Sequence, residues 1–271
     1  KFVMKRLIYQ VYVGNRSRLY DHCVASVADY CKVHDIEHVV QRQPILRIKP
    51  DVFATNRSKE SYEKHGGFLP IFEKENAFQY LWSHDQVAII DADIWVRPGS
   101  PNIFDKVPVG YDFGGVVEKE MPCTPQYIQK IRNYSHMQYS TLTKDNIGRP
   151  IDWKWDERGG EFFNMGMMVL NKSIAYFLKN TRNAAGFLKQ AKYKDFIDGK
   201  GNWKWSTDQT LLNFWLKEER MNTKHLTFHW NGLFSAIPEE RIRQANFVHF
   251  FLKDKLPDRG ENVKQLMEMV E

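Results

Sequence analysis

The chain is poor in cysteine and contains no long hydrophobic run. Of its 271 residues only three are cysteines (Cys23, Cys31 and Cys123), with neither CxxC spacing nor the number needed for a disulfide framework. No stretch approaches the roughly 18 consecutive apolar residues of a transmembrane helix, and none resembles a signal peptide. We therefore expect reduced thiols and a cytoplasmic protein. Because the sequence starts on Lys1, an anchor removed from the N-terminus, as in a Golgi-type lumenal domain, is also compatible with it.

Clustered charge and a glycine-rich phosphate loop are also missing. The 39 Lys and Arg exceed the 33 Asp and Glu by six and are scattered, a distribution that argues against nucleic acid as a partner. A positive balance favours anionic ligands such as nucleoside diphosphates, or peripheral contact with an anionic membrane surface. The turn Val13-Gly14-Asn15-Arg16 is too poor in glycine for the phosphate loop of a sugar nucleotidyltransferase.

What the chain does contain is the pattern of an α/β protein. Its composition, 42% hydrophobic and 14% aromatic, is that of a globular protein, and no repeat or linker divides it. Apolar, β-prone runs predict strands at 7–13, 38–40, 87–96, 113–117, 161–171 and 246–251, and helical spacing predicts helices at 20–34, 61–83, 174–193 and 207–219. The alternation of strand and helix at the start predicts an α/β sheet.

Two further segments show no clear period. Residues 121–158 are polar and aromatic, and we expect an irregular insertion or lid there, whose Tyr and Trp side chains recognise an acceptor. After the last predicted strand we expect only a charged tail.

The most informative segment is Val87–Val96, where a buried strand ends on Asp91 and Asp93. In open α/β sheets, ligands bind beyond the carboxyl ends of the strands. Two carboxylates there suit Mg²⁺ or Mn²⁺, and such a metal can bridge a diphosphate. A haloacid-dehalogenase-type phosphatase also has an Asp-x-Asp after a strand. It would normally have Thr or Val where Trp95 stands, and a later acidic pair that this sequence lacks.

Four other segments contain candidate site residues. They are Lys74 in Phe72-Glu73-Lys74-Glu75, Asn164 and Gly166 in Phe162–Asn171, Asp208 and Gln209 in Ser206–Asn213, and His249 and Lys255 in Asn246–Pro257. Each has a purely structural alternative: an exposed helical lysine, a strand bulge at the glycine, a helix cap, or a structural histidine. For the helix at 207–219, Ser206 or Thr207 could be the cap, and Asp208 suits the helix dipole.

The order of these motifs resembles the GT-A glycosyltransferases, and specifically the retaining branch typified by glycosyltransferase family 8, which includes glycogenin and bacterial galactosyltransferases. The resemblance extends from the first strand to just beyond His249. It implies one domain over residues 1–271, with a single Rossmann-like mixed sheet flanked by helices and a variable C-terminal part. Residues 1–118 would form the nucleotide-binding half. Residues 119–271 would form the acceptor and donor-sugar half, which contains the irregular insertion at 121–158.

The resemblance also implies a role for each candidate. Asp91, Asp93 and His249 would bind Mn²⁺ or Mg²⁺. Lys74 would lie near the donor sugar and phosphate, Asn164 and Gly166 would line the sugar pocket, and Lys255 would bind the diphosphate. Asp208 and Gln209 would be the catalytic pair, with Asp208 holding sugar hydroxyls and Gln209 against the β-face of the sugar. Tyr12 and Asn15 would contact the base, which the resemblance implies is uracil. Two positions depart from the family: Leu252 replaces its glycine, and Leu256 precedes Pro257.

We therefore expect a metal-dependent glycosyltransferase that moves a hexose from a UDP-linked donor to a hydroxyl of a glycan, lipid-linked or protein acceptor, with retention. Two alternatives stay open: an inverting GT-A enzyme, and a non-catalytic carbohydrate-binding protein of the same fold. The sequence does not specify the donor sugar, the acceptor, the linkage or the oligomeric state.

Overall fold

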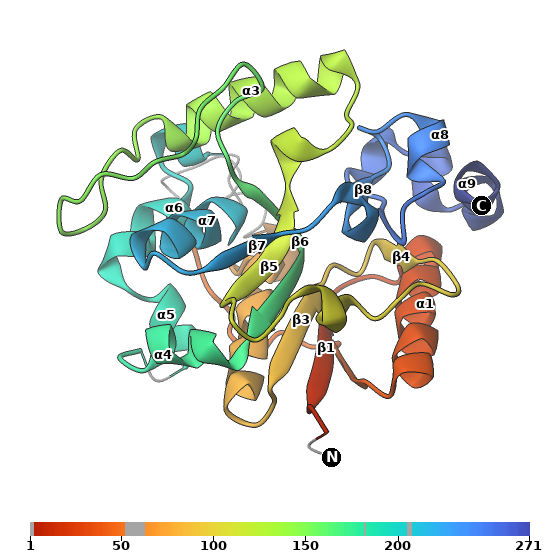
Figure 1. Ribbon diagram of the computed structural model, residues 1–271, viewed down its shortest axis with the longest axis horizontal. Coiled ribbons are helices and arrows are strands. Elements are labelled where there is room, and N and C mark those ends of the chain that lie inside the picture. The colour runs from red at the N-terminus through yellow and green to blue at the C-terminus, as the bar shows by residue number, and fades with distance from the viewer. Residues whose placement is uncertain (1–2, 52–62, 182, 205–207) are drawn as a thin grey trace.

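The computed structural model describes residues 3–51, 63–181, 183–204 and 208–271, and a mixed six-stranded sheet lies at its centre (Figure 1). The strand order is β2-β1-β3-β6-β5-β7. The bounds are β1 (Arg6–Val11), β2 (Glu37–Gln41), β3 (Gln86–Ile90), β5 (Phe113–Val117), β6 (Phe163–Asn171) and β7 (Thr223–His225). β1 is parallel to β2 and β3, β6 is antiparallel to both β3 and β5, and β7 is parallel to β5. The predicted mixed α/β sheet is confirmed.

The central strands are buried on both faces. In β3, Val87 and Ile89 pack into one hydrophobic cluster, and Ala88 and Ile90 into another on the opposite face. A strand covered on both sides reads as a continuous apolar run rather than an alternating one. This is why β1, β3, β5 and β6 could be located from the sequence.

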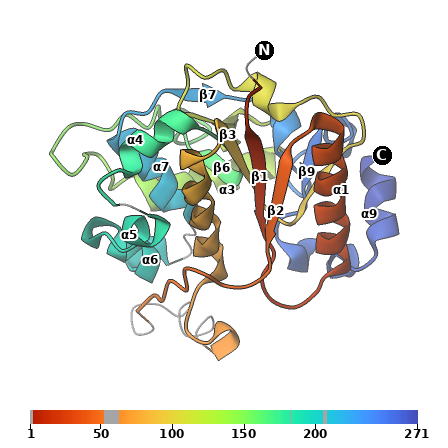
Figure 2. The same ribbon diagram turned by 90° about the horizontal axis from the view of Figure 1, so that it is seen from below.

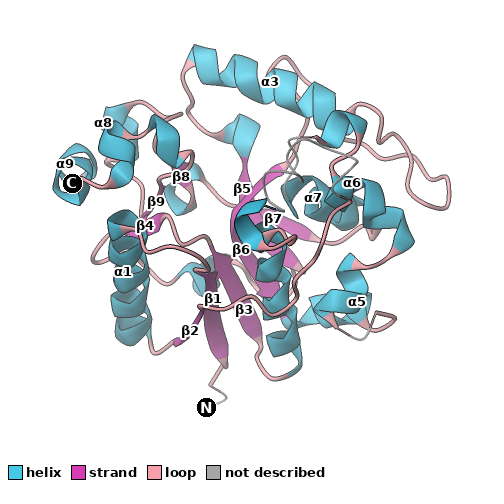
Figure 3. Ribbon diagram, turned by 180° about the vertical axis from the view of Figure 1, so that it is seen from behind, coloured by secondary structure: helices cyan, strands magenta, loops and turns pink. Residues whose placement is uncertain are grey.

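Helices cover the two faces of the sheet (Figure 2). On one side lie α1 (Arg18–His34), α8 (Glu239–Ile242), α9 (Val263–Val270) and a small sheet of β4 (Ile94–Val96), β9 (Phe247–His249) and β8 (Gly232–Leu233). On the other lie η1 (Pro70–Trp82), α4 (Ala175–Leu178), α5 (Ala184–Leu188), α6 (Lys194–Asp198) and α7 (Asp208–Glu218). Figure 3 shows the same layering from behind, with α3 (Pro125–Tyr139) running across one end of the sheet. Short 3₁₀ turns are η2 (Ile103–Lys106), η3 (Glu118–Glu120), η4 (Lys172–Ile174), η5 (Ala191–Tyr193), η6 (Gly201–Trp203), η7 (Phe228–Trp230), η8 (Lys253–Lys255) and η9 (Pro257–Gly260).

The prediction of an irregular insertion at 121–158 is wrong for the first half of that segment, which forms the helix α3. The Thr124 side chain caps its N-terminus, and Pro125 occupies the first helical position. The helix could not be recognised from apolar spacing, because its buried face combines apolar Ile131 with polar Ser135 and Gln138. Two aromatic residues expected to recognise an acceptor, Tyr139 and Trp153, are fully buried and belong to the core.

The expected charged tail and the expected helix at 174–193 also differ from the structure. The C-terminal residues contain α9, which buries Leu266, Met267 and Val270 at helical spacing. The stretch at 174–193 holds short helices rather than one long one, because Asn183 caps a new helix there. The candidate caps Ser206 and Thr207 lie outside the described residues, and α7 begins at Asp208. Within the described ranges no helix is both long and apolar enough to cross a bilayer.

Candidate functional site

A cavity of about 500 Å³ opens at the edge of the sheet where β1 and β3 end. This edge also receives the carboxyl end of β5 and the first residues of the antiparallel β6, so side chains from four strands converge on it. Of the predicted site residues, Tyr12, Lys74, Asp91, Asp93, Asn164, Gly166, Asp208, Gln209 and His249 line the cavity. Its size is within the range of small-molecule binding sites, about 300–1,000 Å³.

Asp91, Asp93 and His249 form a cluster with metal-site geometry. One ligand atom from each lies within 4.8 Å of the others. The His249 Nε2 atom is 3.2 Å from Asp93 Oδ1 and 3.8 Å from Asp91 Oδ2. Asp93 Oδ1 is buried, and apart from the His249 ring nitrogen no donor among the described residues meets it, as expected of an atom that binds a cation. Two carboxylates and one imidazole are a donor set that suits Mn²⁺.

A chain of amides fixes the orientation of the His249 ring. Its Nδ1 atom lies 3.0 Å from Asn231 Oδ1, and Asn231 Nδ2 donates to Asn164 Oδ1 at 2.8 Å. Asn164 Nδ2 in turn donates to Glu118 Oε1 at 2.7 Å. A proton on Nδ1 completes this chain and leaves the Nε2 lone pair facing the two carboxylates. Hydrogen bonds of this kind set the tautomer and direction of a metal-binding histidine.

Gly166 gives the ring its space. A Cβ atom at this position would lie 2.3 Å from His249 Cε1 and 2.7 Å from His249 Nδ1. A glycine within a strand often marks a place where another group comes close to the backbone. At Gly166 that group is the His249 imidazole.

The electrostatics of the cluster favour a bound cation. Burial lowers the pKa of His249, but the Asp93 and Asp91 carboxylates outweigh burial and raise it above its usual value. Burial and the neighbouring Asp93 charge raise the pKa of Asp91, against the opposing effect of the Lys74 ammonium. Both shifts arise from acidic groups crowded in a site of low polarity, which a divalent cation would relieve.

Lys74 links the metal cluster to α7. Its Nζ atom is 2.9 Å from Asp91 Oδ1, 3.2 Å from Asp208 Oδ2 and 3.0 Å from the carbonyl oxygen of Met165. Burial disfavours the charged ammonium, yet the Asp208 and Asp91 carboxylates raise the pKa of Lys74 above its usual value. The alternative of an exposed helical lysine is therefore wrong: this side chain is a buried cation that holds two acidic residues together.

The Gln209 side chain is fixed between β6 and Glu118. Gln209 Oε1 accepts a hydrogen bond of 3.1 Å from the Met165 backbone N–H. A hydrogen bond also joins Gln209 to Glu118. Burial raises the pKa of Glu118, and its hydrogen bonds with Asn164 and Gln209 oppose that shift. An amide fixed in this way can orient a ligand or stabilise a developing charge.

Glu118 and Asn231 are two residues of this site that the sequence analysis missed. Glu118 follows the apolar strand β5 directly, as Asp91 follows β3, so the same signal of a carboxylate at a strand end could have found it. Asn231 lies in a short turn, Trp230-Asn231-Gly232, with no pattern in the sequence that marks it.

Two predicted site residues, Asn15 and Lys255, do not line the cavity and are exposed. Near the same end of the cavity, the Lys253 Nζ atom lies 3.3 Å from Ser17 Oγ and 5.8 Å from the ring centre of Tyr20, which does line it. Tyr12, also in the lining, is buried, and the Arg42 guanidinium lies 4.5 Å from the centre of its ring.

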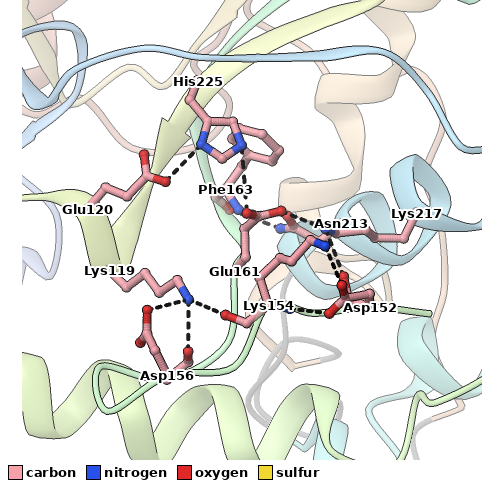
Figure 4. A network of polar contacts seen from close by, with 11 residues as sticks. Lys119, Glu120, Asp152, Lys154, Asp156, Glu161, Phe163, Asn213, Lys217 and His225 are labelled. Atoms are coloured by element: carbon pink, nitrogen blue, oxygen red, sulfur yellow. Dashed lines mark hydrogen bonds and ion pairs between the residues drawn. The ribbon is translucent and has the colours of Figure 1, made fainter.

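A second acidic cluster with a histidine lies on β7 and its neighbours (Figure 4). The His225 Nδ1 atom is 2.8 Å from Glu120 Oε1, and the His225 Nε2 atom is 3.9 Å from Glu161 Oε2. One ligand atom from each of Glu120, Glu161 and His225 lies within 4.8 Å of the others, but the close contacts of this cluster are ion pairs. Lys217 Nζ, 2.6 Å from Glu161 Oε1, already neutralises that carboxylate. The hydrogen bond that the His225 ring donates to Glu120 raises the pKa of His225, which favours an imidazolium that bridges two acids.

The whole chain is similar in fold to solved glycosyltransferases. A glycosyltransferase involved in the glycosylation of the major capsid of PBCV-1 is 12% identical, with a TM-score of 0.52 over 97% of this chain and 99% of that one. The galactosyltransferase LgtC, in complex with donor and acceptor sugar analogues, is 13% identical, with a TM-score of 0.51 over 97% of this chain and 95% of that one. The bifunctional glycosyltransferase WbbM is 13% identical, with a TM-score of 0.50 over 99% of this chain and 51% of that one.

No family model and no curated protein matches the chain. The likeness to solved structures shows the fold, which is that of the GT-A glycosyltransferases. The resemblance that the sequence motifs predicted is confirmed at this level.

Proposed function

We propose that this protein is a metal-dependent glycosyltransferase that moves a sugar from a nucleoside diphosphate donor to a hydroxyl of a glycan, lipid-linked or protein acceptor. The observation that supports this proposal most strongly is one cavity that holds both the Asp91–Asp93–His249 cluster and the Asp208–Gln209 pair, in a chain with the GT-A fold. Fold alone would not suffice, since one fold serves many functions.

The reaction breaks the bond between an anomeric carbon and a diphosphate. Negative charge collects on the leaving group, and the sugar becomes oxocarbenium-like. A Mn²⁺ or Mg²⁺ ion held by Asp91, Asp93 and His249 would supply a Lewis acid for that diphosphate. Within the chain, Lys74 fixes Asp91 relative to Asp208, so that the metal site and the sugar site keep a set distance.

The sugar half of the pocket follows from α7 and β6. Asp208 would accept hydrogen bonds from sugar hydroxyls, and Asn164 and Gly166 would form the wall beside them. Gln209, fixed by Met165 and Glu118, would stabilise positive charge on the sugar with its amide oxygen rather than act as a nucleophile. We expect retention of the anomeric configuration, with attack from the leaving-group face.

The nucleotide half would be residues 1–118, and the acceptor and donor-sugar half residues 119–271, within one domain. Tyr12 and Tyr20 would enclose the base, for which we propose uracil, so the donor would be UDP-linked. We propose that Trp155, which is 41% exposed and stacked on His136, is the aromatic residue of the 121–158 segment that meets an acceptor.

The test is a panel of nucleotide sugars offered to the protein with and without Mn²⁺. We expect metal-dependent release of one nucleoside diphosphate, abolished in Asp93→Ala and retained in Asp29→Ala, a matched change at an exposed position on α1. The anomeric configuration of the product, read by NMR, distinguishes retention from inversion. If no donor binds with or without metal, the enzyme proposal is wrong and a non-catalytic carbohydrate-binding protein is favoured.

A further inference from the structure

Glu75, the neighbour of Lys74 on η1, is a buried acid with no evident partner. Its side chain is 1% exposed, and neither carboxyl oxygen has a hydrogen-bond donor among the described residues. Asp208 Oδ2 is also buried, and its only partner among the described residues is the Lys74 ammonium, with which it forms an ion pair. Buried polar atoms are almost always paired, so these three oxygens together require an explanation.

A side-chain hydrogen bond joins the carboxyl groups of Glu75 and Asp208. The charged groups that act on Glu75 are Asp208, from α7, and Lys74, from its own helix. Two ionised carboxylates contain only acceptors and cannot bond to one another. A single proton on either group turns the contact into a carboxylic acid–carboxylate hydrogen bond and satisfies both sides.

The surroundings decide which group has the proton. The Lys74 ammonium is in contact with Asp208 Oδ2 and Asp91 Oδ1, so the ionised state is stabilised at those two acids. Burial and the facing Asp208 charge raise the pKa of Glu75 well above its usual value. Burial raises the pKa of Asp208 as well, but the Lys74 ammonium and the hydrogen bond from Glu75 oppose that shift. The proton therefore belongs to Glu75.

We propose that Glu75 is a positioning residue that remains protonated in the folded protein and donates a hydrogen bond to Asp208. The bond aims the ionised Asp208 carboxylate into the cavity, where, on the proposed function, it binds donor-sugar hydroxyls. Glu75 itself does not line the cavity. A neutral Glu75 also leaves Lys74 opposed by two carboxylates, those of Asp91 and Asp208, rather than three.

The first experiment detects the proton directly and needs no activity. Infrared spectra of the wild type and Glu75→Gln are compared at neutral pH, because Gln has the shape and donor capacity of a protonated Glu. We expect a carboxylic acid C=O band in the wild type that is missing in the variant. Equal acid bands in the two proteins mean that Glu75 is ionised, which overturns the proposal. If Glu75→Gln fails to fold, Asp208→Asn replaces it, and the same band should diminish because the amide can donate to an ionised Glu75.

The second experiment measures stability against pH. A raised pKa in the folded state means that the folded form holds the proton after the unfolded chain has lost it. The unfolding equilibrium constant of the wild type should therefore rise by up to about tenfold per pH unit above the ordinary Glu pKa, relative to Glu75→Gln. Parallel pH profiles for the two proteins would contradict a protonated Glu75.

The third experiment separates positioning from mere packing. Glu75→Leu fills the same space but cannot donate, so we expect kcat/KM to fall about tenfold or more, whereas Glu75→Gln restores most of it. Equal loss in both variants would show that a simple structural role suffices. If the wild type transfers no sugar, the proposed function fails, but the infrared and stability results still decide the protonation of Glu75.

Discussion

Leu252 has a backbone conformation that its side chain disfavours. It lies at φ 56° and ψ 63°, in the left-handed region, at the position where the resembling family has glycine. This conformation destabilises a residue with a Cβ atom by about 1–2 kcal/mol. Because the Leu252 side chain is 51% exposed, its burial offsets little of that destabilisation.

We expect Leu252→Gly to stabilise the protein by about 1 kcal/mol, because it removes the left-handed strain. Urea unfolding measures the change. Leu252→Ala is the matched control, since it removes the side chain but keeps the Cβ atom and the strain. A Gly variant less stable than the Ala variant would show that the strain is absent.

Gly166 determines whether His249 can occupy its place. We expect Gly166→Ala to weaken Mn²⁺ binding about 10- to 100-fold, because the new methyl group would overlap the imidazole and displace it from Asp93. Titration calorimetry with Mn²⁺ measures the effect. Gly110→Ala, where an added Cβ atom meets nothing within 4 Å, is the control and should bind as the wild type does. Equal affinity of both variants would contradict a metal site at His249.

At the scale of elements, the ionic network around His225 joins β7 to η3 and to the start of β6 (Figure 4). Its contribution to stability depends on pH. The Glu120 hydrogen bond raises the pKa of His225 in the folded protein. The bridge is therefore fully formed below the ordinary histidine pKa of about 6.5 and is lost as the pH rises through the raised value.

We expect His225→Gln to destabilise the protein most below pH ~6.5 and progressively less as the pH rises above that value. Glu120→Gln should show the same pH dependence, and the double variant should add little to either single one, because both remove one interaction. Urea unfolding at several pH values is the measurement. A constant difference across pH would mean that His225 contributes by packing alone.

The elements found from the sequence are those whose burial leaves a simple pattern. β3 is covered on both faces, and α1 buries Cys23, Val27 and Cys31 at helical spacing, so both read clearly. α3 was missed because its buried side includes polar residues that pair inside the protein, such as Gln138 with Thr210. β8 is only two residues long and has no period at all.

The site was predicted in part for a related reason. Asp91 and Asp93 stand where an apolar strand ends, so local sequence reveals them. Glu75 was not predicted because it lies in a charged segment of the kind usually found on a protein surface. Only the fold shows that Glu73, Lys74 and Glu75 are all buried. Lys255 illustrates the converse: spacing from His249 suggested a ligand contact, but the left-handed turn at Leu252 leads to an exposed position.

At the scale of the whole molecule, a metal at the cluster would connect the β3–β4 turn to the distant strand β9. We expect Mn²⁺ to raise the melting temperature of the wild type, by an amount equivalent to about 2.7 kcal/mol at 100 times its Kd, because it binds only the folded state. Differential scanning calorimetry measures the shift. Asp93→Ala should show none, and Ca²⁺ should act more weakly because it prefers an all-oxygen ligand set. A shift that persists in Asp93→Ala would place the metal elsewhere.

The pairing of β4 with β9 has a consequence for how the protein is made. These strands are antiparallel, with Ile94 opposite His249 and Val96 opposite Phe247, and Asp93 accepts a hydrogen bond from the Phe250 N–H through its backbone oxygen. Since side chains alternate along a strand, a slip of one residue would turn His249 to the opposite face. During synthesis the acidic pair emerges long before its histidine, and the three meet only once this register is set. A chain would therefore bind a divalent cation at this cluster only after β9 has been synthesised and has paired with β4 in the correct register.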